Sequence, residues 1–138
     1  MRIAADTNVL VRAMTGDDAR QAVVAQRELA NAELVCIATP ALCELVWVLS
    51  RGHKIPASEI VSVIRRLIEA ENVAVNRPAV EAGLQLLEAG SDFADGVIAY
   101  EGEWLGAETF VSFDREAVAL LTASGRPARL LARGRAIP

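Results

Sequence analysis

The chain has 138 residues, 53% of them hydrophobic, and a formal net charge of −4 at pH 7. This length favours one domain with a proper hydrophobic core, and this hydrophobic fraction excludes an intrinsically disordered chain. No apolar run approaches the roughly 18 residues of a membrane span, and the N-terminus lacks a secretory signal, so we expect a cytoplasmic protein without membrane contact.

Short apolar runs alternate with longer amphipathic segments, a pattern that predicts an α/β fold with a parallel sheet. We expect strands at Ile3 to Ala5, Leu34 to Ile37, Val73 to Val75, Phe110 to Ser112 and Arg129 to Leu131. We expect a short helical turn after Asn8 and helices from Asp18 to Asn31, Thr39 to Arg51, Pro56 to Ile68, Pro78 to Ala89, Phe93 to Leu105 and Arg115 to Thr122. The expected N-caps are Asp17 or Asp18, Thr39, Ser91 or Asp92, and Asp114.

The chain contains no internal repeat and no linker, which predicts a single domain over residues 1–132 followed by a basic tail over 133–138. Residues 1–114 carry a net charge of −8 and residues 115–138 one of +4. The basic end either meets phosphates or an acidic partner, or is simply solvated. The two cysteines, Cys36 and Cys43, are expected to be a reduced and buried pair.

Four acidic residues stand at the edges of apolar segments: Asp6, Glu44, Asp95 and Asp114. Burial of an unpaired carboxylate is costly, and clustered carboxylates raise one another's pKa unless a cation neutralises them. A hard divalent ion with oxygen ligands, Mg²⁺ or Mn²⁺, satisfies such a set best. The four acids therefore predict a metal site.

The expected strand ends place these acids together. Asp6 and Asp114 follow predicted strands, and the carboxyl ends of parallel strands face the crevice where ligands bind. Glu44 and Asp95 fall in the first turns of helices, and Asp92 shares a helix side with Asp95. The supporting oxygen and amide groups are those of Thr7, Asn8 and Ser112. A metal in such a site suits phosphodiester hydrolysis, because it lowers the pKa of its bound water and stabilises charge on the phosphate. Whether one ion or two bind is left open by the sequence.

Four segments resemble the motifs of PIN-domain ribonucleases, in an order and spacing similar to the VapC-type toxins of toxin–antitoxin pairs, including FitB-like members. They are Ala5 to Leu10, Thr39 to Glu44, Asp92 to Ala99 and Val111 to Arg115. The resemblance implies a three-layer α/β sandwich, with a central parallel sheet of about five strands flanked by helices, and Mg²⁺-dependent endonucleolytic cleavage of RNA, with Mn²⁺ as a possible substitute.

Carried onto this sequence, the resemblance implies a catalytic set of Asp6, Glu44, Asp95 and Asp114, with Asp6 and Asp95 as direct metal ligands. It implies supporting roles for Thr7, Asn8, Asp92 and Ser112. It further implies a homodimer inhibited by a small VapB-like antitoxin. Gly96 stands where such toxins often carry alanine, a departure that we expect to be without effect on catalysis.

Other interpretations stay open at this point. Asp114 is also an adequate N-cap, Thr7 and Asn8 also suit a turn, and Arg115 either steers phosphate or is an ordinary exposed residue. A non-catalytic nucleic-acid or protein binding module on the same fold, and a DNA-directed nuclease, are the alternative functions. A haloacid-dehalogenase-type phosphatase or a receiver domain is disfavoured, because Asn8 replaces the second aspartate of the former and Lys54 is the single lysine.

Overall fold

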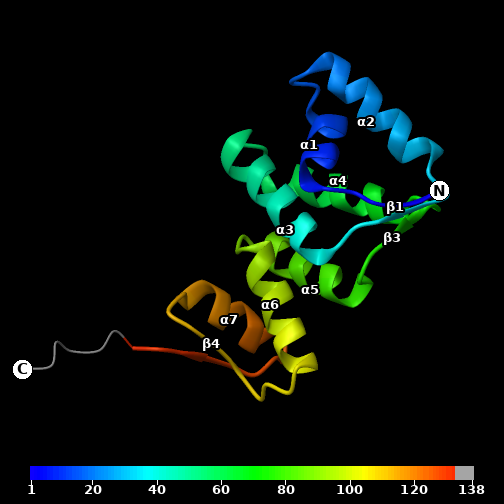
Figure 1. Cartoon of the computed structure of the whole chain (residues 1–138). Helices are drawn as coiled ribbons and strands as arrows, with labels where there is room; N and C mark the ends of the chain where they lie inside the picture. Colours follow the sequence, from blue (N-terminus) through cyan, green and yellow to red (C-terminus); the bar gives the residue numbers. More distant parts are fainter. Residues whose placement is uncertain (133–138) are drawn as a thin grey trace, which may run out of the picture. The chain divides into compact units, whose positions relative to one another are not determined.

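The computed structural model describes residues 1–132, so the predicted basic tail at 133–138 lies outside the described residues. The contacts of the chain divide it into two compact units, residues 1–80 and the residues from Glu81 onward. Figure 1 shows their elements, and each unit is described by itself.

The first unit contains a parallel three-stranded sheet in the order β1-β2-β3. Its strands are β1 (Arg2–Ala4), β2 (Leu34–Cys36) and β3 (Val73–Ala74). Ile3 lies opposite Val35, which lies opposite Val73. Parallel neighbours need long crossover connections, and the helices of this unit supply them.

Four helices and a π-helical segment accompany this sheet in the described first unit: α1 (Thr7–Thr15), α2 (Ala19–Asn31), α3 (Thr39–Trp47), η1 (Val48–Gly52) and α4 (Ala57–Glu69). The π-helical segment η1 continues α3 directly. In α4, Ile60, Ile64 and Ile68 recur at a spacing of four residues and are all buried, as the helical period predicts.

Two local predictions in this unit are wrong. The expected short turn after Asn8 is the nine-residue helix α1, which begins after Asp6 and ends at Gly16 with a left-handed φ of 68°. The N-cap of α3 is Ala38, not Thr39, which is the buried first residue of the helix. Pro40 accepts either position because its missing N–H falls among the donors that a helix start leaves unpaired.

The second unit takes most of α5 (Arg77–Glu88), whose first residues belong to the first unit. It continues through α6 (Phe93–Trp104), β4 (Phe110–Ser112), α7 (Arg115–Ala123) and β5 (Ala128–Leu130), and β4 and β5 pair in parallel. Its core joins three helices through the buried residues Leu86, Ala99, Ala117 and Leu121.

The predicted α/β fold with parallel strands is confirmed. Five strands are present in the described residues, and all their pairings are parallel; they form ladders of three and of two strands. Cys36 is exposed and Cys43 half-buried, so the expectation of two buried thiols is wrong for Cys36. Among residues 1–132, no helix has the length and apolar character that crossing a membrane requires.

Candidate functional site

Asp6 comes directly after the first strand region and before α1. Its side chain is exposed, and its Oδ1 accepts a hydrogen bond of 2.8 Å from the Thr7 N–H, so it caps α1. The cost of burying a carboxylate, from which the sequence predicts a metal site, does not apply to Asp6, which is exposed. Of the two supporting residues on α1, Thr7 is buried and Asn8 is exposed.

Glu44 lies on α3 and is exposed, although its neighbours in sequence are apolar. Leu42, Leu45 and Val46 take the buried face of this helix, so Glu44 points away from the core. Since α1 and α3 pack against each other, the first unit carries the two acids on neighbouring elements.

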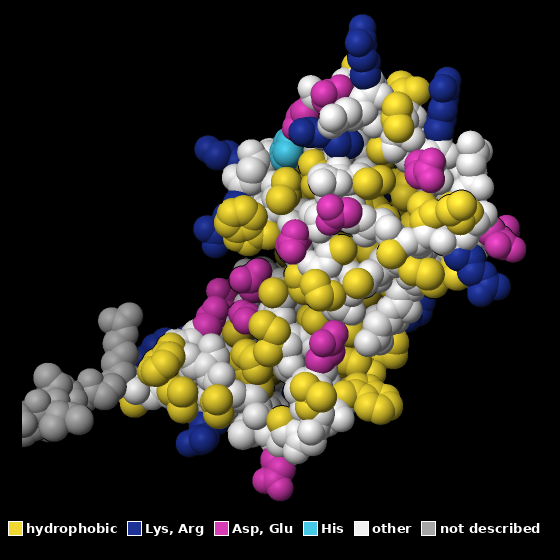
Figure 2. All heavy atoms as spheres, in the orientation of Figure 1, with side chains coloured by type: hydrophobic (Ala, Val, Ile, Leu, Met, Phe, Trp, Pro, Cys, Tyr) yellow, Lys and Arg dark blue, Asp and Glu magenta, His cyan; other side chains and the backbone are white. Residues whose placement is uncertain are grey.

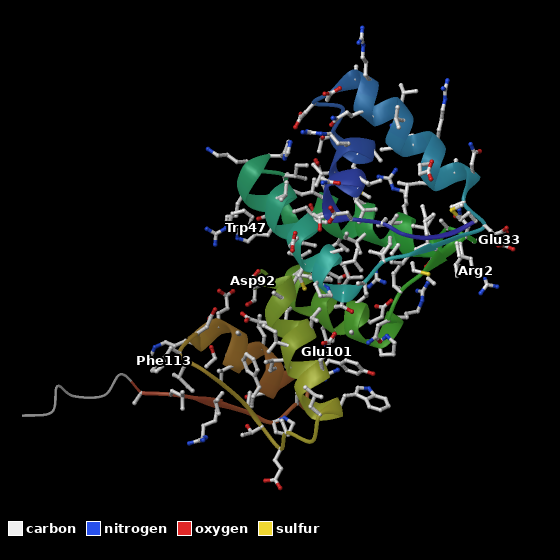
Figure 3. All side chains as sticks on the ribbon, in the orientation of Figure 1. Arg2, Glu33, Trp47, Asp92, Glu101 and Phe113 are labelled. Carbon is white, nitrogen blue, oxygen red and sulfur yellow. The ribbon has the colours of Figure 1, made fainter. Side chains whose placement is uncertain are left out.

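Two carboxylates of the second unit, Asp92 and Asp114, act on a third, Asp95, where α6 and α7 begin. Asp95, in the first turn of α6, is half-buried; burial raises its pKa, and the negative charges of Asp92 and Asp114 raise it further. Acidic side chains gather at this end of the two helices in Figure 2, and Figure 3 labels Asp92 there. The structure thus brings Asp92, Asp95 and Asp114 into one field of negative charge.

Asp92 has the position of an N-cap on α6 but not the contact. Its backbone is extended, with φ −90° and ψ 127°, and its side chain accepts no capping hydrogen bond. The expectation that Asp92 caps this helix is wrong in that respect. The negative charge of Asp92 instead contributes to the raised pKa of Asp95.

Asp114 is exposed at the start of α7, where hydrogen bonds orient its carboxylate. Its Oδ1 accepts hydrogen bonds from the N–H groups of Glu116 and Ala117, at 3.0 and 3.1 Å. Its own N–H donates to Oγ of Ser112 at 2.9 Å. The predicted N-cap is therefore confirmed, and Ser112 fixes the backbone of the residue that provides it.

A groove of about 740 Å³ opens beside Asp114. It is lined by Phe113 and Arg115 from the junction of β4 and α7, and by Leu130 and Leu131 from the end of β5. Arg115 is exposed at the first position of α7, so the groove has a cation next to the acidic cluster.

Gly96, directly after Asp95, allows a close crossing of α5 and α6. A Cβ on Gly96 would lie 2.2 Å from the carbonyl oxygen of Ala82, and one on Gly83 would lie 2.7 Å from the Phe93 ring. Glycine differs from alanine by only one methyl group, so the departure is small in size. In this chain the space for an alanine methyl group is taken by backbone.

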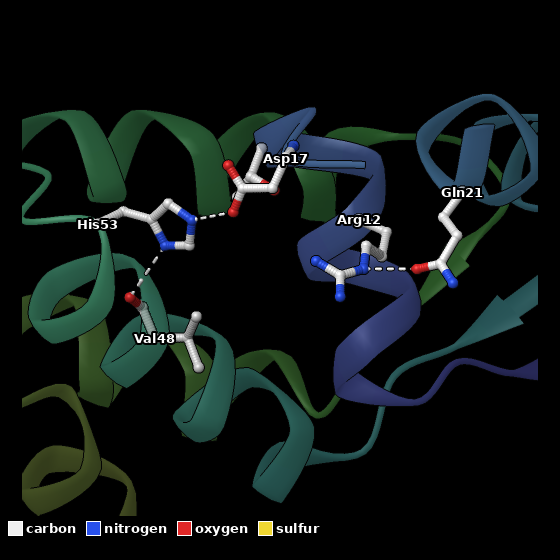
Figure 4. Close-up of polar contacts among 6 residues, drawn as sticks. Arg12, Asp17, Gln21, Val48 and His53 are labelled. Atoms are coloured by element: carbon white, nitrogen blue, oxygen red, sulfur yellow. Dashed lines mark hydrogen bonds and ion pairs between the residues drawn. The ribbon is translucent and has the colours of Figure 1, made fainter. Parts of the chain in front are cut away.

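His53 has a polar contact that the sequence did not indicate, since Asp17 lies 36 positions away. Its Nε2 lies 2.6 Å from Oδ2 of Asp17, and its Nδ1 lies 3.4 Å from the Val48 carbonyl oxygen (Figure 4). The hydrogen bond to Asp17 raises the pKa of His53 and, in return, lowers the pKa of Asp17. His53 thus joins η1 to the turn between α1 and α2.

The model of the PIN domain family matches residues 3–120, which is most of the chain. The chain belongs to the PIN domain family. A comparison with curated proteins found no match.

PIN domains are generally metal-dependent nucleases, so family membership places the chain at that coarse level of function. All four acids lie inside the matched residues. Among residues 1–132, no three His, Cys, Asp or Glu side chains are arranged as a ready metal site. The oxygen chemistry of these PIN-domain acids nevertheless fits a hard divalent ion.

Proposed function

We propose that this PIN domain is a Mg²⁺-dependent endoribonuclease, the toxin of a VapC-type, FitB-like toxin–antitoxin pair. The observation that supports the proposal is the cluster of Asp92, Asp95 and Asp114, in which burial, and after it the negative charges of Asp92 and Asp114, raise the pKa of Asp95. A divalent cation is the natural neutraliser of such a cluster, and Mn²⁺ is an acceptable substitute.

In this proposal Asp6 and Asp95 are the direct metal ligands, and Glu44 and Asp114 complete the acidic set. The helix cap on Asp114 and the contact of Ser112 with its backbone keep one carboxylate in a fixed orientation. Thr7, Asn8 and Asp92 support the set, and Arg115 offers a cation to the RNA. When bound, the metal activates water for attack on the phosphodiester.

RNA binding by a chain of net charge −4 requires local positive charge. The metal supplies part of it. Arg115 beside the groove at Asp114, and the exposed Arg129 on β5, supply cations from the second unit.

The proposed antitoxin has a candidate contact surface in the first unit. A cavity of about 620 Å³ lies between α1 and α2. Its lining includes the apolar side chains of Val9, Val24 and Ala25 and the cations Arg12 and Arg20. Val24 is 66% exposed there, which suits an apolar side chain of a small partner. A homodimer is part of the same proposal.

Cleavage of a labelled RNA pool by the purified chain tests the activity. We expect cutting with Mg²⁺ or Mn²⁺, none with EDTA, and loss in Asp95→Asn. Glu28→Gln, which removes an exposed acid on α2, is the matched control and should cut normally. Cutting that persists in Asp95→Asn would refute the site.

A parallel DNA pool separates the alternatives. Preference for DNA would make the chain a DNA-directed nuclease, and metal binding without cutting of either pool would favour a non-catalytic binding module. The toxin assignment has its own test: expression of the wild-type chain should arrest growth, and co-expression of the small adjacent gene should relieve the arrest. Growth without arrest would contradict the toxin role. The nuclease activity would then still be judged by the cleavage assay alone.

A further inference from the structure

The groove beside Asp114 is also where the described part of the second unit ends. Its lining includes Phe113, Leu131 and Ala132, and Ala132 is the last described residue. Phe113, which Figure 3 labels at the junction of β4 and α7, is 64% exposed. The residues that follow, 133–138, have the sequence Arg-Gly-Arg-Ala-Ile-Pro and lie outside the described residues. The chain therefore continues from the wall of this groove.

The register of the two strands explains why the chain leaves β5 beside Asp114. The strands β4 and β5 are parallel, and Ser112 lies opposite Leu130. Past the end of β5, the Leu131 N–H still donates a hydrogen bond of 2.8 Å to the Ser112 carbonyl oxygen. Asp114 and Ala132 each follow the paired residues by two positions, and neighbouring strands are about 4.8 Å apart. The basic tail thus begins at the same sheet edge as this candidate catalytic acid.

The groove carries more negative than positive charge. Among its lining residues in the described part of the chain, Asp114 and Glu116 are acidic and Arg115 is the one cation. The other two carboxylates of the acidic cluster, where α6 begins, add to this negative field. Such a surface attracts cations and repels the phosphates of RNA.

We propose that the segment 133–138 docks in this groove, where its two arginines pair with Asp114 and Glu116, and that it thereby inhibits the enzyme. The docking is independent of the proposed nuclease function, whereas the inhibitory effect rests on it. An arginine on the free carboxylate oxygen of Asp114 excludes a metal ion from that oxygen, and a filled groove keeps RNA away from it. The segment has to leave the groove before the site can bind both.

The length and the chemistry of the segment fit the groove. An extended chain spans at most about 3.5 Å per residue, so the Cα atom of Arg135 can reach about 11 Å from that of Ala132. The planar guanidinium group pairs with a carboxylate through two parallel hydrogen bonds. Ile137 offers an apolar side chain to the exposed Phe113 and the half-buried Leu131. Because the segment is tethered at the groove, its binding is intramolecular and weak contacts suffice.

Neither RNA nor a second copy of the chain matches the groove as well. RNA brings phosphates to a surface on which acids outnumber cations. A second copy brings the same lining, so its excess of acids adds to the negative charge even where Arg115 of one copy pairs with Glu116 of the other. The segment 133–138 brings two arginines and no acidic side chain.

Disulfide trapping measures the docking directly. Cys36→Ser and Cys43→Ser together remove both native thiols. Arg115→Cys and Ala136→Cys then place one thiol on the groove and one on the segment, and leave the acids and the two tail arginines in place. With oxidised glutathione, we expect the intramolecular disulfide to form at least about tenfold faster than in the control pair Thr122→Cys with Ala136→Cys. Thr122 is exposed on α7, about 10 Å along the helix from position 115.

Removal of charge tests the role of the arginines. Arg133→Gln with Arg135→Gln, added to the trapping variant, should slow disulfide formation toward the rate of the control pair. In the full chain with its native cysteines, the same double substitution should raise kcat/KM for RNA cleavage about 2- to 10-fold at low salt and lower the Mg²⁺ concentration that gives half the maximal rate. Arg133→Lys with Arg135→Lys keeps the charge and should retain the inhibition. Arg27→Gln with Arg66→Gln removes two exposed arginines from the first unit and should leave cleavage unchanged.

The outcomes separate the docking from the proposed function. If the pair at positions 115 and 136 forms its disulfide no faster than the control pair, the docking is refuted and the nuclease is judged by its own cleavage assay. If the disulfide joins two chains, the groove is an interface between copies and the inference is overturned. If Arg133→Gln with Arg135→Gln weakens RNA binding and slows cleavage, the segment holds RNA and the inhibitory role is refuted. If the disulfide forms quickly but neither the wild type nor the glutamine variant cuts RNA, the docking stands and the proposed function fails.

Discussion

The substitution Gly96→Ala tests whether the crossing of α5 and α6 positions Asp95. The new Cβ would lie 2.2 Å from the Ala82 carbonyl oxygen, 2.7 Å from the Ala82 carbonyl carbon and 2.9 Å from the Gly83 Cα. Ordinary contact begins at 3.4 Å, so the backbone of α5 must recede by about 1.2 Å, the difference between 3.4 and 2.2 Å. All three atoms are backbone, so no side chain can rotate away to relieve the clash.

The energy follows from two opposing effects. Overpacking a tight core costs about 1–3 kcal/mol, and a clash with backbone belongs at the upper end of that range. Alanine in place of glycine in a helix returns about 1 kcal/mol. We therefore expect Gly96→Ala to lower the free energy of unfolding by about 2 kcal/mol and the melting temperature by roughly 5–10 °C.

Gly102→Ala is the matched control, because it makes the same substitution in the same helix. Its Cβ would meet only the Ala107 Cβ, at 3.8 Å, which is ordinary contact. Here the helix propensity acts alone, and we expect stabilisation of about 0.5–1 kcal/mol. Urea denaturation of both variants beside the wild type is the measurement. Equal shifts of the same sign would refute the argument that the crossing leaves no room for a methyl group.

The same displacement has a catalytic consequence, since Gly96 adjoins Asp95. Misplacement of a reacting group by about 1 Å can cost about 10²-fold in rate. We expect Gly96→Ala to lose about this factor in RNA cleavage, below its own melting transition, whereas Gly102→Ala keeps the wild-type rate. Full activity in a measurably destabilised Gly96→Ala would show that α6 holds Asp95 in place by other contacts.

Three further predictions concern the charged groups. Burial and neighbouring acids raise the pKa of Asp95, so its ionised form costs stability above its ordinary pKa of 3.8. Without metal, Asp95→Asn should therefore melt at a higher temperature than the wild type at neutral pH, and this difference in melting temperature should vanish as pH falls below 3.8. Mg²⁺ should reduce the same difference, because it stabilises only the wild type. Asp114→Ala should cost about 0.5–2 kcal/mol of stability through loss of the cap on α7, whereas Asp114→Asn keeps the cap and loses cleavage, so equal stability losses would contradict the dual role. Because the pKa of His53 is raised and that of Asp17 is lowered, their pair stabilises the fold fully between pH 3.8 and pH 6.5. This stabilisation is lost as pH rises through the folded pKa of His53 and as pH falls through the folded pKa of Asp17, so the melting temperature of the wild type should exceed that of Asp17→Asn within this window. The control is Gln21→Ala, which removes the contact of Gln21 with Arg12 (Figure 4) and whose effect should not depend on pH.

Much of the fold could be predicted because periodicity is a strong local signal. The three buried isoleucines of α4 and the glycine that ends α5 show this, since Gly90 has the φ of 93° that favours glycine after a helix. The strands were predicted to within one or two residues, although they are only two or three residues long. Such short strands carry too few residues for alternation to fix their ends.

The exposure of the acids could not be predicted, because sequence neighbours do not show which face of an element is buried. Glu44 illustrates the error: its neighbours are apolar, yet the helical period turns it away from Leu42 and Leu45. The contact between His53 and Asp17 shows a second limit, because it joins elements that only the fold brings together. The tight crossing at Gly96 shows a third, since a glycine gives no sign of the backbone against it.

Capping a helix and binding a metal are compatible roles for Asp6 and Asp114. Each uses Oδ1 for its helix: Asp6 for the Thr7 N–H, and Asp114 for two N–H groups of α7. In the part of the chain that the structure describes, no hydrogen bond or ion pair involves the second oxygen of either carboxylate. The cap therefore fixes the orientation of an oxygen that remains available, and an orientation fixed before binding lowers the entropy cost of holding a cation. Asparagine retains the capping oxygen and removes the charge, which is why Asp114→Asn separates the two roles that the wild-type residue combines.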